Sequence, residues 1–237
     1  MKTNYLFSLL LLGIIIPELL NADPIPGNQD GSTYLLPAPD LSRFSAGIYL
    51  QARAREVKAH NIKNKLETRR TAGYLAYDIL PWLSIYGTAM DSKQKFIYET
   101  NEGSTEIGGG IILNIIDHEV MSPTLLEDIV RLTAMIQYTK GEYFFFRKSE
   151  DLNEIYGALT LHIINEVDGN KLYWPNAIGF FVGPVYSKLD GENIEEAQAY
   201  GFSLGLEIYF TDRVTLNLGT EQFDQENKYL YGLHVRF

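Results

Sequence analysis

From Arg43 onward, apolar and polar residues alternate at every second position, and the alternation persists to Phe237. Successive side chains of a β-strand point to opposite faces, so a period of two produces one apolar and one polar face. The alternation is clearest in the final stretch, KYLYGLHVRF, whose apolar or aromatic positions are Tyr229, Tyr231, Leu233, Val235 and Phe237. Residues 43–237 are therefore predicted to form an all-β domain.

Ten segments carry the alternation, and most approach the length of about 9–11 residues that a tilted strand needs to cross a bilayer. The second segment is weak, and the seventh contains Pro184, which predicts a bulge or a strand end there. The expected count is therefore ten strands, with eight left open. The segments are residues 48–55, 72–77, 83–89, 106–115, 130–139, 155–163, 176–187, 201–210, 213–219 and 229–237.

Alternation alone does not say which face lies inside. A soluble barrel with an apolar ligand cavity alternates as well, with its apolar face inward. Here one face is Ile, Leu, Val and Phe, whereas the other holds Gly, Ser, Thr, Asn and charges of both signs, which favours lipid outside. Aromatic residues near the segment ends are expected to form a girdle at the membrane interfaces: Tyr77, Trp82, Tyr138, Tyr209, Phe210 and Phe237.

The first 22 residues have the pattern of a secretory signal peptide. Lys2 precedes an apolar run that Pro17 ends, and this run is too short to span a bilayer comfortably. An uncleaved membrane anchor is the alternative. Residues 23–42 hold four prolines and little alternation, so an extended lead-in is expected there. The chain has no Cys, which excludes disulfides and a lipoprotein anchor.

The breaks between segments give an expected orientation. An even strand count places both barrel ends on the periplasmic side, where turns are short. DILPW and FTDRV are tight breaks, whereas Glu56–Leu66, Asp91–Ser104 and Lys188–Glu196 are expected to be longer external loops. Two inner breaks, DHEVMSPTLLED and EVDGNKLYWPN, are long for periplasmic turns. Leu125–Ile136 also has helical spacing, so a helix remains an alternative there.

The closing stretch YLYGLHVRF and the hairpin YDILPWLSIYG resemble the bacterial outer-membrane β-barrel superfamily. The resemblance covers about Arg43 to Phe237. It implies a small up-and-down antiparallel transmembrane barrel in the outer membrane of a Gram-negative-type cell. It also implies that outer-membrane lipid surrounds the chain and that the barrel-assembly machinery is a partner during biogenesis. That machinery would read the alternating residues of the closing strand, Tyr229, Tyr231, Leu233, Val235 and Phe237.

Charged residues on the polar face would line the lumen. One interpretation is a charged constriction in a narrow pore. The other is a lumen filled by mutually neutralising ion pairs, since a barrel of this size has little room beyond its own side chains. The predicted lumen charges are Arg53, Arg55, Arg70, Glu106, Arg131, Glu207, Arg213, Glu221 and Arg236.

Four His residues raise the alternative of a hydrolase. A rim-located, omptin-like enzyme or a lipid-modifying hydrolase needs His beside a carboxylate or Ser. His60 maps to the external rim, and Asp190, Glu192 and Asp224 lie on other external loops. No motif links these residues, so no catalytic residue, metal ligand or cofactor is assigned. His162 and His234 are expected to fill the lumen, and His118 to lie in an inner turn.

The formal charge of −10 argues against a nucleic-acid partner, which needs a basic footprint. The three glycines at 108–110 predict strand curvature or a close approach rather than a phosphate loop, because no helix follows them. EYFFFRKSED at 142–151 is interpreted as part of the girdle, with a glycan-, lipid- or host-binding tip as the alternative. The expected function is a non-enzymatic structural, adhesive or minor-channel barrel, with any extracellular ligand bound by the external loops.

Overall fold

A computed structural model describes residues 43–59, 62–96, 99–121, 127–145, 148–166, 175–191, 194–196, 199–211, 213–223 and 226–237. The predicted signal peptide (1–22) and lead-in (23–42) lie outside the described residues and remain predictions. No helix among the described residues is long and apolar enough to span a membrane.

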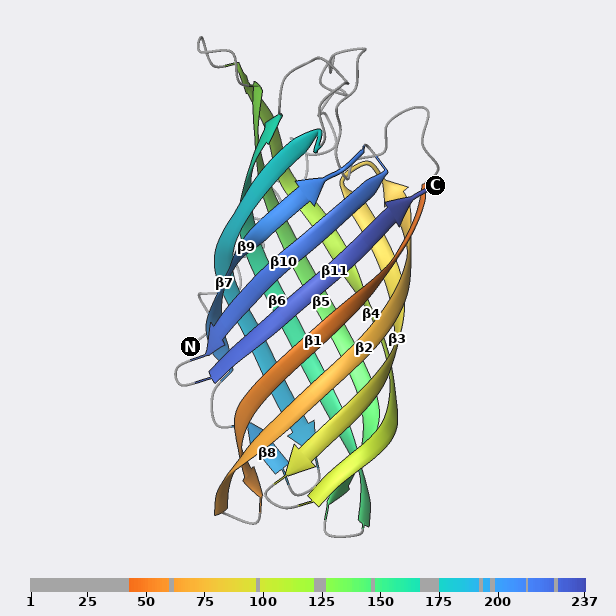
Figure 1. Ribbon diagram of the computed structural model, residues 1–237. Coiled ribbons are helices and arrows are strands. Elements are labelled where there is room, and N and C mark those ends of the chain that lie inside the picture. The colour runs from red at the N-terminus through yellow and green to blue at the C-terminus, as the bar shows by residue number, and fades with distance from the viewer. Residues whose placement is uncertain are drawn as a thin grey trace, which may run out of the picture. The chain divides into compact units, whose positions relative to one another are not determined.

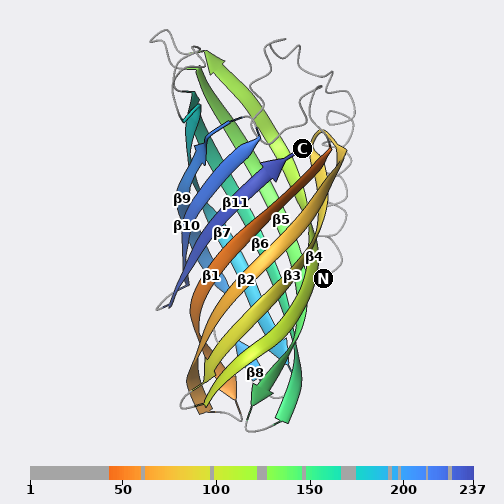
Figure 2. The same ribbon diagram turned by 45° about the vertical axis from the view of Figure 1, so that its right-hand side comes forward.

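Eleven strands form one antiparallel sheet, of which ten make a closed barrel (Figures 1 and 2). The predicted all-β antiparallel barrel of ten strands is confirmed. The strands are β1 (Phe44–Ala59), β2 (Ile62–Leu80), β3 (Leu83–Phe96), β4 (Glu99–Met121), β5 (Glu127–Phe145), β6 (Lys148–Glu166), β7 (Ala177–Gly191), β8 (Ile194–Glu196), β9 (Tyr200–Tyr209), β10 (Val214–Phe223) and β11 (Glu226–Arg236).

The barrel closes where β1 pairs with β11, in a register that runs from Ser45↔Arg236 to Arg53↔Lys228. We call the end that holds Phe44 and Phe237 the proximal end. The β1–β2, β3–β4, β5–β6 and β10–β11 connections mark the distal end. Every other barrel strand pairs with its sequence neighbour, apart from the short β8 between β7 and β9. The connectivity is therefore up-and-down.

The outward face of the barrel is apolar along a continuous belt. Ile48, Leu75, Ile107, Phe180 and Leu204 are each more than half exposed. The inward positions between such residues carry buried polar and charged side chains. The interpretation as a soluble barrel with its apolar face inward is therefore wrong, because burial of the polar face leaves the apolar face for lipid.

Three segments that the sequence left in doubt are strands. β2 pairs with β1 from Ile62 to Tyr77. β5 is a strand from Glu127 onward, so the described part of the helix proposed for Leu125–Ile136 does not form. β7 continues through Pro184 and stays in register with β9. On the β6 side, pairing skips from Val185 to Val182, because proline has no N–H to donate.

At the distal end of the barrel, several strands extend much further than the sequence predicted. Glu56–Leu66 and Asp91–Ser104, expected as loops, are mostly strand. β9, β10 and β11 are short and stop well before the distal ends of β1 to β6 (Figures 1 and 2). β8 lies beyond them, pairing with Val57–Ala59 of β1 and with Asp190 of β7. One side of the wall therefore projects further than the other, and β8 bridges the gap.

A bulge in β4 exchanges its two faces. The β4–β5 register shifts between Asn114 and Ile116, so that Ile115 and Ile116 are both exposed to the outside. Before the bulge the odd-numbered residues of β4 face outward, whereas after it the even-numbered residues do. Asp117 consequently points inward, where Arg131 donates to its carboxylate at 3.2 Å.

The glycines at 108–110 allow a close approach, as predicted. The Tyr86 side chain crosses Gly110 to donate its hydroxyl hydrogen bond to Gln137 Oε1 at 2.9 Å. A Cβ at Gly110 would overlap both the Tyr86 hydroxyl and the Ile136 carbonyl oxygen.

Gly110→Ala is expected to reduce the fraction of protein that folds in detergent, because backbone and ring must both move to accept the methyl group. Gly87→Ala is the matched control, since nothing lies within 4 Å of a Cβ there. The folded fraction is read as the band of altered mobility in unheated SDS gels. Equal folded fractions for the two variants would show that the close approach at Gly110 does not constrain the fold.

Candidate functional site: the packed interior

Among the described residues, the carboxylate of Glu154 joins four side chains of the interior. Its Oε1 accepts from Arg55 Nη2 at 2.7 Å and Arg53 Nη1 at 3.1 Å, and its Oε2 accepts from Arg70 Nη1 at 2.7 Å. Ser187 Oγ donates to Oε1 at 2.8 Å. These four partners come from β1, β2 and β7, whereas Glu154 lies on β6. One carboxylate thus joins opposite walls of the barrel.

Glu106 on β4 extends this group. Arg70 Nε donates to Glu106 Oε1 at 3.1 Å, and Arg70 Nη2 lies 2.9 Å from Glu106 Oε2 as an ion pair. The exposed fraction of Arg55 is 1% and that of Glu106 is 0%. We call Arg53, Arg55, Arg70, Glu106 and Glu154 the Glu154 cluster.

A neighbouring ion pair comes from the short side of the wall. Lys228 Nζ lies 2.9 Å from Glu221 Oε1, which also accepts the Tyr156 hydroxyl at 2.8 Å. The Lys228 ammonium lies 4.3 Å from the Tyr156 ring centroid, and Arg53 lies at the same distance over Phe223. The contact of Arg53 with Phe223, two positions from Glu221 on β10, links the Glu154 cluster to this side of the barrel.

A third group surrounds Glu207 on β9. Its Oε2 accepts the Tyr209 hydroxyl at 2.7 Å and lies 3.1 Å from His162 Nδ1. The exposed fraction of Tyr209 is 0%. The assignment of Tyr209 to the interface girdle is therefore wrong. The period of two places it on the same inward face as Glu207.

Packing continues beyond the charges toward the distal end. Val57 follows Arg55 on the inward face of β1, Leu152 precedes Glu154 on β6, and Leu189 follows Ser187 on β7. Their exposed fractions are 0%, 1% and 1%, and that of Leu66 on β2 is 1%. Apolar side chains therefore fill the interior on the distal side of the Glu154 cluster.

The charges of the described interior balance. The buried basic residues are Arg53, Arg55, Arg70, Arg131, Lys228 and Arg236. Five acidic residues are equally buried, and the side chain of Asp117, 22% exposed, is the sixth. These are Asp78, Glu106, Asp117, Glu154, Glu207 and Glu221. Six positive and six negative charges leave this interior without a net charge.

Eight of the nine predicted lumen charges lie in this buried set. The exception is Arg213, which is exposed in the turn between β9 and β10. Glu154, Lys228 and Asp78 were missed, although alternation with the outward Ile155, Tyr229 and Tyr77 would have identified all three. Asp117 could not be identified in this way, because the bulge at Ile115 reverses the parity.

Four of the six girdle residues gather toward the proximal end: Tyr77, Trp82, Phe210 and Phe237. Tyr77 lies against Phe44 with ring centroids 4.9 Å apart. Tyr138 points outward at the distal edge of the belt, half exposed, and donates to Asn153 Oδ1 at 2.7 Å. The closing-strand residues Tyr229, Tyr231, Leu233 and Phe237 are exposed on the outside, and Val235 is half-buried. Recognition of these residues during assembly remains a prediction.

Beyond the belt the outward face is charged. Lys140, two residues after Tyr138, lies 2.9 Å from the Asp151 carboxylate. The hydrogen bond and charge of Asp151 raise the pKa of Lys140 above its ordinary value. Lys65, Glu67 and Arg69 occupy successive outward positions of β2. The distal wall therefore projects into water rather than lipid.

The hydrolase alternative remains largely untested. His60, Glu192 and Asp224 lie outside the described residues, and Asp190 is exposed on β7. His118 is exposed near the end of β4, whereas the rings of His162 and His234 form interior hydrogen bonds. Across the described strands, no three His, Cys, Asp or Glu side chains are placed to hold a metal ion. The tip at 142–151 lies mostly outside the residues whose side chains are described.

No protein-family model and no curated protein matches the sequence. Among solved structures, the chain is similar to an outer membrane channel from Pseudomonas putida F1, with 10% identity over 88% of this chain and 99% of that chain and a TM-score of 0.45. It is also similar to the transport unit of the Escherichia coli autotransporter AIDA-I, with 10% identity over 87% and 94% of the chains and a TM-score of 0.47.

A further similar structure is the outer membrane protease OmpT from Escherichia coli, with 11% identity over 89% of this chain and 100% of that chain and a TM-score of 0.38. Identities and TM-scores this low do not distinguish one activity from another. The fold of this chain rests on its own closed hydrogen-bonded ring.

Glu154→Ala is expected to destabilise the folded barrel by about 3 kcal/mol or more, because three buried guanidinium groups would lose their shared carboxylate. Asp151→Asn is the matched control. It removes a carboxylate three residues away that is exposed to water, and it is expected to leave stability unchanged. Urea unfolding in detergent, followed by tryptophan fluorescence, measures both. A Glu154→Ala midpoint equal to that of Asp151→Asn would contradict a stabilising role for the cluster.

Proposed function

We propose that this chain is a non-enzymatic outer-membrane barrel with a sealed interior that holds a projecting wall of strands outside the cell. Its role is structural or adhesive, and its external surface carries any partner specificity. The observation that carries this proposal is the interior, which ion pairs and apolar side chains fill from the level of Glu207 to that of Leu66.

The sealed interior argues against the minor-channel role. Conduction through a narrow pore needs a continuous wetted path, with sites that an ion enters and leaves. The Glu154 cluster crosses the barrel at nearly zero exposure, and Val57, Leu66, Leu152 and Leu189 lie beyond it. An ion would have to break several buried ion pairs to pass.

The projecting wall supports an external role. β2 runs from Arg69 to its distal end at Ile62, which is about 23 Å of strand at roughly 3.3 Å per residue. Cross-strand charges, including Glu67 opposite Lys95, cover this surface. Such a charged, hydrogen-bonded wall is suited to contact a polar surface or macromolecule outside the bilayer.

Location in the outer membrane is part of the proposal. A closed antiparallel barrel with an apolar belt satisfies every backbone group within its own ring, which is what a strand protein in lipid requires. The predicted signal peptide would export the chain. The even number of barrel strands would place both barrel ends on the periplasmic side, so that the distal wall faces outward.

The purified protein in planar lipid bilayers is expected to give no ion-conducting steps. Insertion is checked separately, by the altered mobility in unheated SDS gels of the protein recovered from the lipid. Regular steps from the unaltered protein would contradict the sealed interior and favour the channel role.

A further inference from the structure

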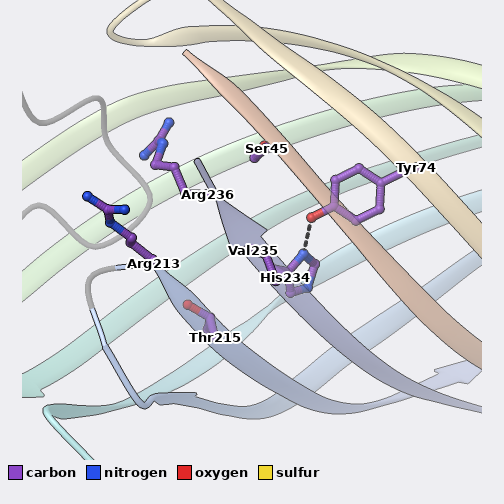
Figure 3. Close-up of a pocket in the computed structure, with 7 residues that line it drawn as sticks. All are labelled: Ser45, Tyr74, Arg213, Thr215, His234, Val235 and Arg236. Atoms are coloured by element: carbon purple, nitrogen blue, oxygen red, sulfur yellow. Dashed lines mark hydrogen bonds between the residues drawn. The ribbon is translucent and has the colours of Figure 1, made fainter. Parts of the chain in front are cut away.

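A small pocket opens in the interior at the proximal end. It has a volume of about 50 Å³. Ser45, Tyr74, Arg213, Thr215, His234 and Arg236 line it, as Figure 3 shows. A cavity of this size has room for a few water molecules or one small tetrahedral ion. We call it the proximal pocket.

Arg236 brings unused hydrogen-bond donors to this pocket. Its exposed fraction is 7%, and its Nη2 forms an ion pair with Asp78 Oδ2. Its Nε and Nη1 have no hydrogen-bond partner. Leaving a buried donor unsatisfied has a free-energy cost, and the cost is larger when the group is charged. An acceptor in the pocket would remove that cost.

Arg213 adds a second positive charge. Its carbonyl oxygen accepts the Arg236 N–H at 2.8 Å, which fixes the two residues beside each other. The Arg213 side chain is exposed and has no carboxylate within ion-pair distance among the described residues. In Figure 3 both guanidinium groups lie on the same side of the pocket. Asp78 is the one described carboxylate that pairs there, and it also accepts from Ser84 Oγ at 2.5 Å.

The remaining lining defines which groups are free to bind. Both ring nitrogens of His234 are engaged, Nδ1 with the Tyr74 hydroxyl and Nε2 with Asn217 Nδ2 at 3.0 Å. His234 and Tyr74 therefore form a wall rather than ligands. The hydroxyls of Ser45 and Thr215 add two neutral donors to the two guanidinium groups.

We propose that the proximal pocket binds a phosphate group. Two guanidinium groups and two hydroxyls offer more donors than the two oxygens of a carboxylate can accept, whereas a phosphate monoester presents three strong acceptor oxygens. The planar fork of arginine matches phosphate geometry. The pocket lies inside the barrel, at the end that carries Phe44 and Tyr77 on its outer face. The phosphate is therefore either a free ion or the headgroup of a lipid that reaches over the rim into the lumen.

The test uses the folded full-length barrel in a phosphate-free zwitterionic sulfobetaine detergent. Isothermal titration is carried out with inorganic phosphate and, separately, with short-chain phosphatidic acid. Arg213→Gln is the first variant, because this exposed side chain makes no described contact on which folding depends. It is expected to weaken binding about tenfold, the effect of one lost charge-assisted hydrogen bond. Arg69→Gln, an exposed arginine on the distal wall, is the matched control and is expected to bind as the unaltered protein does.

The two ligands separate the possible sources of phosphate. If both inorganic phosphate and phosphatidic acid bind, and Arg213→Gln weakens this binding while Arg69→Gln does not, the result supports a site for which the free ion suffices. Binding of phosphatidic acid alone, with the same dependence on Arg213, supports a lipid-headgroup site. Absence of binding, or equal binding by the Arg213→Gln and Arg69→Gln variants, would overturn the proposal. Thr215→Val provides a second variant that leaves the arginine charges in place, and it is expected to weaken binding in the same direction.

Discussion

The pairing of β1 with β11 is the interaction on which the rest of the molecule depends. In lipid, an unpaired backbone N–H or C=O costs several kcal/mol, so a sheet can span the bilayer only when it has no free edge. The register from Ser45↔Arg236 to Arg53↔Lys228 removes that edge over the apolar belt. On the distal side of the belt, β1 extends past its pairing with β11, and the short β8 covers part of the free edge of β1 there.

Closure with ten strands also determines the interior. A ring of this size has little space beyond its inward side chains, and the outward positions are already apolar for lipid. The inward positions consequently hold polar groups that must satisfy one another, since burial of an unpaired charge is very costly. The Glu154 cluster meets this requirement with groups from several walls. Arg236 meets it incompletely, as Arg131 does, and Arg236 differs from Arg131 in that it lines the proximal pocket.

The alternation predicted much of this architecture because lipid and interior impose opposite polarity on neighbouring residues. It predicted the ten strands, and it placed Arg53, Arg70 and Glu207 inside. It failed where that contrast disappears. Beyond the belt the outward faces of β2 and β3 are charged, so lipid no longer imposes an apolar face there. Glu56–Leu66 and Asp91–Ser104 therefore resembled loops, although they continue as strands.

Other features depend on geometry that a local pattern does not contain. The bulge at Ile115 brings Asp117 inside against the parity of the sequence. Tyr209 was assigned to the interface girdle because it is aromatic and lies near a strand end. The period of two instead places it inside the barrel, on the same face as Glu207. The contact between Arg53 and Glu154 joins residues 101 positions apart, and it requires knowledge of how the ring closes.

The most direct test of the central claim, a closed barrel with lipid outside and ion pairs inside, is a single-cysteine scan of β6. The chain has no Cys of its own, so each introduced thiol can carry one spin label without background. In lipid bilayers, labels at Leu159, Leu161 and Ile163 should collide freely with dissolved oxygen, whereas labels at Thr160 and His162 should be shielded. An alternation of this kind, with a period of two, is the predicted result. Equal accessibility at all five positions, or an alternation of the opposite sign, would contradict the account.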